Sequence, residues 1–302
     1  MLATGALVHG RFRVVGPLGE GAHGAVYRAV DLAHAEAEEV ALKVLHDDIA
    51  ADESYRLRLI REAHAIGQLH GTCAVRVHAL DQTPDGQLYL AMEYLEGMDL
   101  AAYVRHHEKQ LGPLPVAEVL SMLGPVAATL QIAHAKGIVH RDVKPKNIFV
   151  CDDASRGRMR LLDFGLARDL GVSSMTSDGT VAGSPATIAP EVWLGRKDRD
   201  HRVDVYALGI TVFRALGGCY PFDPRLPLAR LLMEVTLAER PSLHARRPDL
   251  PAAVDGWVQR SLTIDPTYRF ASVRDQWSAL WDLLGATAGR SSQPPPSGAR
   301  FR

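Results

Sequence analysis

A short polar stretch, His140-Arg141-Asp142-Val143-Lys144-Pro145-Lys146-Asn147, carries groups suited to proton and cation chemistry. Asn147 lies five positions after Asp142 (147 − 142), and Asp163 follows Asp142 by 21 positions (163 − 142) in Asp163-Phe164-Gly165. A carboxylate can accept or orient a hydroxyl proton, and carboxylate and amide oxygens coordinate hard cations. The alternative for the first stretch is a charged surface turn, and Asp-Phe-Gly alone is a common tripeptide. Together the two motifs favour a catalytic site.

A glycine-rich run, Gly19-Glu20-Gly21-Ala22-His23-Gly24-Ala25-Val26, lies near the N-terminus. Glycines let backbone N–H groups approach phosphate oxygens without an intervening Cβ. An isolated run of this type is as often a plain glycine-rich hairpin. A dinucleotide-binding turn would need a helix after it. Because Ala25-Val26-Tyr27 continues as a strand, the sequence favours a hairpin folded over a nucleotide.

One lysine stands inside an apolar strand, Val40-Ala41-Leu42-Lys43. The alternative is an edge lysine whose ammonium group reaches water. A phosphate-binding role requires a carboxylate partner, and Glu62 is the candidate, 19 positions further on (62 − 43). A single glutamate on an amphipathic helix is usually solvated surface, so Glu62 depends on the motifs around it.

The first part of the chain predicts a small sheet with one helix. Residues 12–45 alternate short apolar runs with glycine, and 74–80 and 88–92 predict two more strands. Pro84-Asp85-Gly86 is a turn signal between the latter two. Helical spacing relates Leu59, Ala63, Ile66 and Leu69.

The remainder predicts helices. Stripes at helical spacing are Val119, Leu123, Val126, Leu130 and Ala133, then Val205, Leu208, Val212 and Leu216. Pro113 and Pro115 mark the start of the first of these helices. Gly137-Ile138-Val139 predicts a helix end and a short strand, and residues 226–284 predict mostly helices. The tail, residues 286–302, is rich in Pro and Ser and predicts disorder.

Bulk properties exclude several classes. The net charge of −1 gives no general attraction to nucleic acid or to an anionic membrane. Three widely spaced cysteines form neither a disulfide framework nor a zinc motif, which favours a reducing compartment. No signal peptide is visible, and Val203–Phe222 is interrupted by charged residues, which predicts a buried helix rather than a membrane span.

In order and spacing, these motifs resemble the signature set of protein kinases, specifically the bacterial, eukaryotic-like (Hanks-type) serine/threonine kinases. The resemblance covers roughly residues 10–285. It implies an α+β, bilobal fold: an N-lobe over 10–92 with an antiparallel sheet and one main helix, a hinge at 93–96, and a mostly helical C-lobe over 97–285.

The resemblance also implies roles for individual residues. Lys43 would contact the α- and β-phosphates of ATP and pair with Glu62, Asp142 would be the catalytic base, and Asn147 and Asp163 would hold Mg²⁺, or Mn²⁺ in its place. The other nucleotide-binding positions are Leu18, Gly19, Gly21, Gly24, Val26, Ala41, Met92, Glu93, Leu95, Asp99 and Phe149. Core packing is the alternative for Val26, Ala41 and Phe149, and an ordinary exposed acid is the alternative for Asp99.

Lys144, two residues after the catalytic aspartate, resembles the pattern of Ser/Thr-specific kinases. The segment from Asp163 to Glu191 corresponds to the activation segment, and Arg141 with Arg168 resembles a pocket for a phosphorylated loop. Thr176 and Thr180 are the phosphorylation candidates, with a merely flexible Ser/Thr-rich loop as the alternative. Glu191 would pair with Arg269, and Asp204 would cap the backbone of the catalytic loop.

Two positions depart from the family pattern. Thr187 stands where an aromatic residue is usual, which implies altered substrate docking, although Ser184 keeps the nearby hydroxyl. Lys146 replaces a residue that is commonly acidic or small, and the sequence offers no function for it. Neither change removes a phosphate- or metal-binding group.

The sequence has three rival interpretations. A pseudokinase would be expected to lose Lys43, Asp142 or Asp163, and all three are present. Small-molecule kinases share the base but typically lack Lys144-Pro145 and Ala189-Pro190-Glu191. A nucleic-acid-binding or purely structural protein has no basic face or repeat in its favour. The resemblance implies protein substrates and self-association for autophosphorylation in trans. The composition predicts no nucleic-acid partner, no membrane segment in this chain and a cytoplasmic location for it, with a longer, membrane-anchored parent protein as the alternative.

Overall fold

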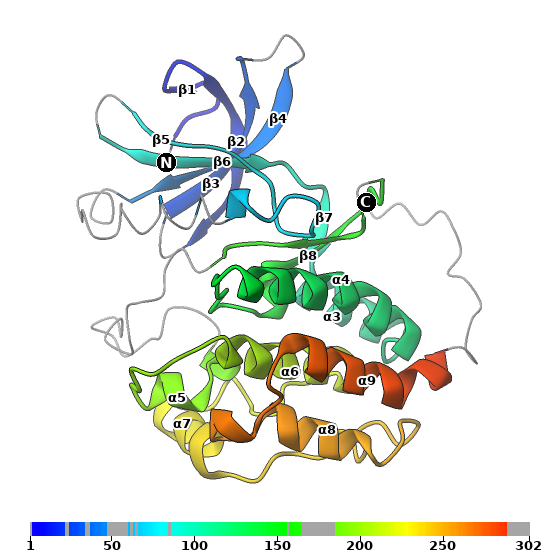
Figure 1. The fold of residues 1–302 in the computed structure, drawn as a ribbon. Helices are drawn as coiled ribbons and strands as arrows, with labels where there is room; N and C mark the ends of the chain where they lie inside the picture. Colours follow the sequence, from blue (N-terminus) through cyan, green and yellow to red (C-terminus); the bar gives the residue numbers. More distant parts are fainter. Residues whose placement is uncertain are drawn as a thin grey trace. The chain divides into compact units, whose positions relative to one another are not determined.

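The computed structural model describes residues 2–21, 24–33, 37–46, 60, 63, 66–83, 86–155, 157–164 and 185–288 (Figure 1). The chain divides into two compact units, Met1–Glu96 and Gly97–Arg302. The first unit is mostly strand and the second mostly helix, so the predicted α+β class is confirmed. The predicted helix with Leu59 and Glu62 lies largely outside the described residues.

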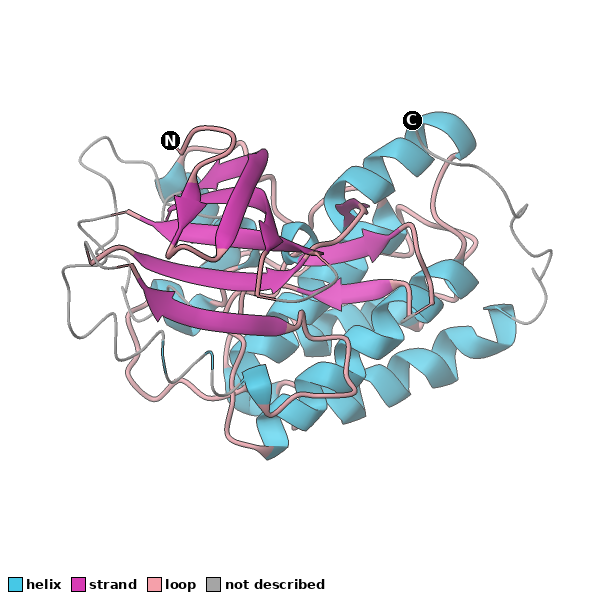
Figure 2. Ribbon diagram, turned by 90° about the horizontal axis from the view of Figure 1, so that it is seen from above, coloured by secondary structure: helices cyan, strands magenta, loops and turns pink. Residues whose placement is uncertain are grey.

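The first unit contains a six-stranded antiparallel sheet with the order β1-β2-β3-β4-β6-β5. Figure 2 shows its strands turning relative to one another, as twisted sheets do. Its strands are β1 (Leu7–Val8), β2 (Phe12–Gly21), β3 (Gly24–Asp31), β4 (Glu38–Leu45), β5 (Val77–Gln82) and β6 (Leu88–Glu93). The predicted strands are therefore confirmed, with β5 beginning later than the apolar run suggested.

One face of this sheet forms the core of the unit. Tyr27, Leu42 and Ala91 are each at most 2% exposed, and Phe12 and Tyr89 pack edge to face with ring centroids 5.5 Å apart. Because side chains alternate along a strand, the neighbours of these residues in sequence lie on the opposite face. That opposite face carries Lys43.

The second unit begins with β7 (Gly97–Asp99), which joins a three-stranded sheet with β8 (Ile148–Cys151) and β9 (Met159–Leu161). Its longer helices are α3 (Leu100–Leu111), α4 (Val116–Ala135), α6 (Arg202–Gly217), α7 (Leu228–Leu237), α8 (Val254–Ser261) and α9 (Val273–Ala288). The short ones are η1 (Pro145–Asn147), η3 (Pro185–Thr187), α5 (Pro190–Trp193) and η4 (Pro266–Tyr268).

Helix α6 is buried along nearly its whole length, as the apolar sequence from Val203 onward predicts. It contacts α4, α8 and α9, and Figure 1 shows it between α4 and α8. Gly209 makes the contact with α8 close, because a Cβ there would lie 2.9 Å from the Cβ of Ser261. Helix α6 is thus a fixed internal support for the segments that pack on it.

Helix α4 starts at Val116 directly after Pro115, and all five residues of its predicted stripe are buried. Within the described part of the chain, it is the one helix long and apolar enough to cross a membrane by length and composition. More than half of that window, 56%, is buried inside the protein, where α4 packs on α9 and α6. A buried core helix passes the same test.

The short strand predicted at Ile138-Val139 is wrong. The backbone N–H of Ile138 donates to Ala133 O at the end of α4, and the N–H of His140 donates to the Asp204 carboxylate. These amides are therefore used by a helix end and a side chain, and not by a sheet. All three cysteines are thiols outside any disulfide, and Cys73 and Cys151 are buried.

Candidate active site

Three polar side chains of the predicted catalytic stretch meet at Asp142. Lys144 Nζ lies 2.6 Å from Asp142 Oδ2, and Asn147 Nδ2 donates to the same oxygen at 2.9 Å. Asn147 Nδ2 also donates to the backbone carbonyl of Asp142 at 2.9 Å. The Lys144 and Asp142 side chains are only 13% and 20% exposed, so solvent screens this pair less than a surface ion pair. The carboxylate is held in one orientation beside a fixed positive charge.

Asn147 and Asp163 lie at the same end of the β8–β9 ladder. Asn147 precedes Ile148, which pairs with Leu161, and the N–H of Leu162 donates to Asn147 O at 2.8 Å. Asp163 then has a φ of 48°, a conformation uncommon for a residue other than glycine. The ladder therefore brings both predicted cation-binding residues to one edge.

The donor set of these two residues fits magnesium bound together with a phosphate. Because Asn147 Nδ2 faces Asp142, its amide oxygen is the atom that it can offer to a cation. Among the described residues, no group of three or more His, Cys, Asp or Glu side chains could hold a metal ion. Mg²⁺ commonly takes one or two protein ligands and completes its shell with water and substrate phosphates.

The buried carboxylate of Asp204, at the start of α6, fixes the backbone that precedes Asp142. It accepts hydrogen bonds from the N–H of His140 at 2.8 Å and the N–H of Arg141 at 2.7 Å. His134 Nε2, on α4, donates to it at 2.8 Å. Burial alone would raise the pKa of Asp204, but these hydrogen bonds and the two nearby imidazoles lower it below its usual value. The Asp204 carboxylate therefore remains ionised and accepts hydrogen bonds from three donors.

His140 joins the catalytic loop to the Asp163-Phe164 segment. The N–H of Asp142 donates to His140 Nδ1 at 3.2 Å, so the ring proton is on Nε2, which donates to Leu162 O at 2.9 Å. The imidazole lies 4.5 Å from the Phe164 ring, centroid to centroid. Burial lowers the pKa of His140, which keeps the ring neutral. His134 and His140 were both missed as positioning residues, because a single histidine gives no signal of its partners.

A second buried ion pair supports the segment after residue 184. Arg269 binds Glu191 in a bidentate manner at 2.7 and 2.6 Å, with both side chains at most 3% exposed. Arg269 also donates to the carbonyls of Thr263, Arg202 and Ile264. Every part of the guanidinium is thereby satisfied, and the pair links α5 to the start of α6 and to the segment around η4. Thr187, just before α5, is 5% exposed.

In the first unit, the sheet face opposite the core carries the predicted nucleotide-binding side chains. Lys43 pairs in register with Val26, and Ala41 pairs with Met92. Cross-strand partners share a face, as do residues two apart, so these four side chains lie on one surface. All four are partly exposed, unlike the core residues between them. The surface offers small and aliphatic side chains next to one ammonium group.

The glycines of the N-terminal run differ in how much space surrounds them, and so in why a glycine suits each position. Gly24 has a φ of 150°, and a Cβ there would lie 2.1 Å from the Val44 carbonyl oxygen. Among the described residues other than the chain neighbours, no atom lies within 4 Å of a Cβ built at Gly19, and one built at Gly21 meets only the Gly24 carbonyl oxygen, at 4.0 Å. Packing therefore requires Gly24, whereas Gly19 and Gly21 leave backbone open for a ligand to approach.

Of the remaining candidate residues, two acids have local hydrogen-bond partners and two leucines are at least partly exposed to solvent. Glu93 accepts a hydrogen bond from the N–H of Arg76 at 2.8 Å. Asp99 caps α3 by accepting from the N–H of Ala102 at 2.7 Å, and it pairs with Phe149 across the β7–β8 ladder. Leu18 is 48% exposed, and Leu95 is partly exposed. Glu62, Arg168, Thr176, Thr180 and Ser184 lie outside the described residues.

The first unit is strand-rich, with a glycine-rich hairpin and a lysine on the sheet face opposite its core. Together with a helical unit that carries the Asp142 loop, these features define the protein kinase class. Residues 12–273 match the family described as protein kinase domain, so the chain belongs to that family. It is 36% identical over 286 residues to serine/threonine-protein kinase pkn2 of Myxococcus xanthus, covering 93% of this chain and 33% of that protein.

Further relatives with similar sequences or structures are also serine/threonine-protein kinases or kinase domains. The chain is 37% identical to serine/threonine-protein kinase PksC of Streptomyces coelicolor, covering 97% of this chain and 51% of PksC. A crystal structure of the PknI kinase domain of Mycobacterium tuberculosis has a TM-score of 0.74 at 34% identity, covering 94% of this chain and all of that one. The chain thus spans between a third and about half of these curated relatives and the whole of the solved kinase domain.

Proposed function

We propose that this chain transfers the γ-phosphate of ATP to serine or threonine hydroxyls of proteins. The observation that carries the proposal is the convergence of Lys144 Nζ and Asn147 Nδ2 on Asp142 Oδ2, at 2.6 and 2.9 Å. A carboxylate oriented in this way can receive the proton of an incoming hydroxyl. Lys144 adds positive charge beside the transferring phosphoryl group, where negative charge must be stabilised.

The remaining residues position ATP. Lys43 holds the α- and β-phosphates with Glu62 as its partner, and the backbone at Gly19 and Gly21 covers them. Val26, Ala41 and Phe149 pack against adenine, Met92 to Leu95 line its edge, and Asp99 reaches the ribose. Phosphoryl transfer needs little covalent chemistry from the protein, so positioning and charge neutralisation supply most of the rate.

Asn147 and Asp163 would hold Mg²⁺, with Mn²⁺ as a substitute. The ion would supply positive charge that neutralises the phosphates of the nucleotide. The same kinase domain, placed at residues 10–285, would act in the cytoplasm, where ATP is available. Two copies of the chain would associate transiently, and each would phosphorylate the activation segment of the other, with Thr176 and Thr180 as the acceptors.

The test compares wild type with Asp142→Asn and with Asp282→Asn, an exposed carboxylate on α9, using labelled ATP, magnesium and a generic protein substrate. Wild type and Asp282→Asn should incorporate phosphate on serine or threonine, whereas Asp142→Asn should lose at least about a hundredfold in kcat. Phosphate incorporation by Asp142→Asn equal to that of wild type would contradict the role of Asp142 as the base. If none of the three proteins incorporates phosphate, the chain is a scaffold without kinase chemistry. Phosphotyrosine as the main product would contradict the role given to Lys144, and phosphate on a small amino alcohol alone would identify a small-molecule kinase.

A further inference from the structure

A groove of about 920 Å³ lies in the second unit, beside the catalytic loop. It is formed by α3, η1, η3, the end of α6 and the loop that follows α6. Its charged lining residues are Arg105, Lys146, Arg214, Asp223, Arg225 and Arg246. Five of these six are cationic, although the whole chain has a net charge of −1. The groove is therefore a local concentration of positive charge.

Two of the five cations are already neutralised. Arg214 binds Glu108 through two hydrogen bonds of 2.9 and 3.3 Å, and Arg225 binds Asp223 through two of 2.9 Å. For Arg105, Lys146 and Arg246, no carboxylate in the described part of the chain lies within ion-pairing distance, and all three side chains are exposed. Three positive charges of the groove thus have no counter-charge from the described protein.

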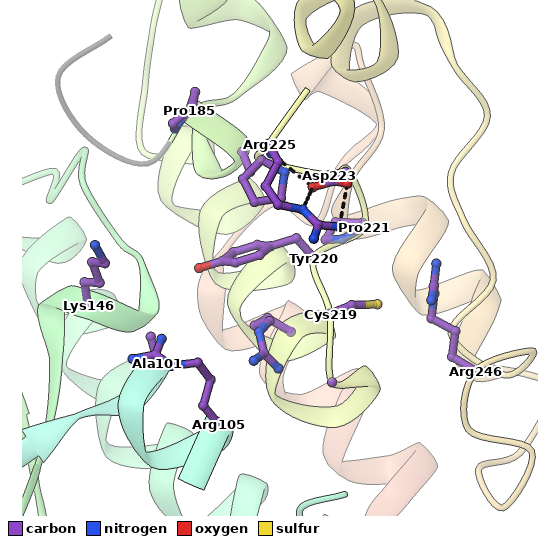
Figure 3. Close-up of a pocket in the computed structure, with 14 residues that line it drawn as sticks. Ala101, Arg105, Lys146, Pro185, Cys219, Tyr220, Pro221, Asp223, Arg225 and Arg246 are labelled. Atoms are coloured by element: carbon purple, nitrogen blue, oxygen red, sulfur yellow. Dashed lines mark hydrogen bonds and ion pairs between the residues drawn. The ribbon is translucent and has the colours of Figure 1, made fainter. Parts of the chain in front are cut away.

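The groove also has surfaces for a polypeptide to pack on. Figure 3 shows the Tyr220 ring in the middle of the groove, with Lys146 and Arg105 on one side and Asp223 and Arg225 on the other. Pro185, Pro221 and Pro224 add apolar surface to the lining of the groove. An aromatic ring and prolines between cations suit an extended peptide with acidic side chains better than a small anion.

Lys146 connects this groove to the reacting group. It lies four positions after Asp142 (146 − 142) and directly precedes Asn147, whose amide holds the Asp142 carboxylate. An extended chain advances about 3.3–3.6 Å per residue. Four residues span at most about 14 Å, so a substrate with its hydroxyl at Asp142 can bring a residue within about four positions of the acceptor to Lys146. The groove can therefore contact the substrate residues that flank the acceptor serine or threonine.

We propose that this groove binds an acidic segment of the protein substrate, so that the chain selects serine or threonine flanked by Asp or Glu. The proposal rests on the proposed kinase function and names its substrate class. Arginine and lysine pair with carboxylates by charge-assisted hydrogen bonds, and the same unneutralised cations repel a basic peptide. Discrimination then comes from both attraction and repulsion. This assigns a role to Lys146, for which the sequence alone offered none.

The test uses one peptide scaffold with a single serine, whose flanking positions on both sides carry Asp and Glu, Ala, or Lys and Arg. Wild type should phosphorylate the acidic peptide with a kcat/KM at least about tenfold above the neutral one, and the basic peptide below it. Lys146→Glu and Arg105→Glu should each reduce or reverse this ranking. Arg274→Glu, the same charge change at an exposed site on α9, should keep the wild-type ranking.

Binding of fluorescently labelled peptides, measured by anisotropy, provides a readout without catalysis. Wild type should bind the acidic peptide more tightly than the basic one, and added salt should weaken this binding because it screens the charges. Equal kcat/KM for the three peptides, with normal activity, would overturn the groove proposal and leave the kinase function intact. Absence of activity with a retained acidic preference in binding would instead refute the kinase function alone. Thermal unfolding of each variant excludes misfolding as the cause.

Discussion

Asp204 fixes the backbone of Arg141 from 63 residues further along the chain: its Oδ1 accepts the Arg141 N–H at 2.7 Å. Arg141 has a φ of 64°, in the left-handed region that a residue with a side chain rarely adopts. Such a conformation costs about 1–3 kcal/mol and persists only where surrounding contacts enforce it. The conformation that presents Asp142 therefore depends on a buried carboxylate at the start of α6.

Asp204→Asn should impair both stability and turnover. An amide has one oxygen to accept hydrogen bonds, whereas the carboxylate accepts from three donors, and the new NH₂ group would face a donor. We expect a loss of about 2–3 kcal/mol in the free energy of unfolding and about a hundredfold in kcat. Urea unfolding and steady-state kinetics measure these, with Asp282→Asn as the control. An unchanged kcat in a destabilised variant would mean that Asp204 does not position the loop.

Glu191→Gln should destabilise the second unit. It leaves the Arg269 guanidinium buried with a neutral partner, and breaking a buried ion pair from one side costs about 3–5 kcal/mol. The more solvent-exposed pair of Arg230 and Glu234 on α7, 66% and 29% exposed, is the comparison, since Glu234→Gln should cost less than about 0.5 kcal/mol. Thermal unfolding distinguishes the two. A loss from Glu191→Gln as small as that from Glu234→Gln would contradict the structural role of the pair.

Two glycine substitutions should have opposite signatures. Gly24→Ala forces a Cβ against the Val44 carbonyl at a φ of 150°, so it should cost at least about 2 kcal/mol of stability. In Gly19→Ala the new Cβ meets no atom of the described residues beyond its chain neighbours, so stability should stay within about 0.5 kcal/mol while KM for ATP rises severalfold. Thermal melts with and without ATP and magnesium measure both effects. An unchanged KM in Gly19→Ala would argue against close approach of phosphate at that position.

The buried His140 ring should make stability depend on pH. Burial lowers its native pKa below the usual 6.5, so at pH values below 6.5 the unfolded chain binds a proton that the native state does not. Stability should therefore fall as the pH drops from 6.5 towards the native pKa, by up to about 1.4 kcal/mol per pH unit for this group. His140→Asn keeps an acceptor for the Asp142 N–H and should flatten this slope in urea unfolding between pH 7 and 5. Parallel slopes for the two proteins would rule out His140 as the source.

The sequence motifs predicted the α+β class and the strands of the first sheet, because period-two patterns and glycine turns are local signals. They also named Asp142, Lys144 and Asn147, which lie within six residues of one another. Long-range partners were harder to find. The resemblance supplied Asp204 and the Glu191–Arg269 pair, but nothing in the chain pointed to His134 as a donor to Asp204 over 70 positions.

The error at Ile138-Val139 has the same origin. An apolar pair after a glycine has the local pattern of a strand, yet the N–H of His140 is taken by a side chain 64 positions away. The groove at Lys146 is a further case, because its cations come from α3, η1, the end of α6 and the loops beyond it. Periodicity reports which face of an element is buried, but not which element buries it.

The hydrogen bonds of Asp204 also set an order of events during protein synthesis. Asp142 is translated 62 positions before Asp204 (204 − 142), an interval of roughly 3–12 s at typical elongation rates. Over that interval the nascent chain contains its catalytic loop but not the carboxylate that holds it. The loop can reach its working conformation only after α6 is made and has packed on α4. The conformation of the catalytic loop is thus fixed late, when most of the kinase domain has already been synthesised.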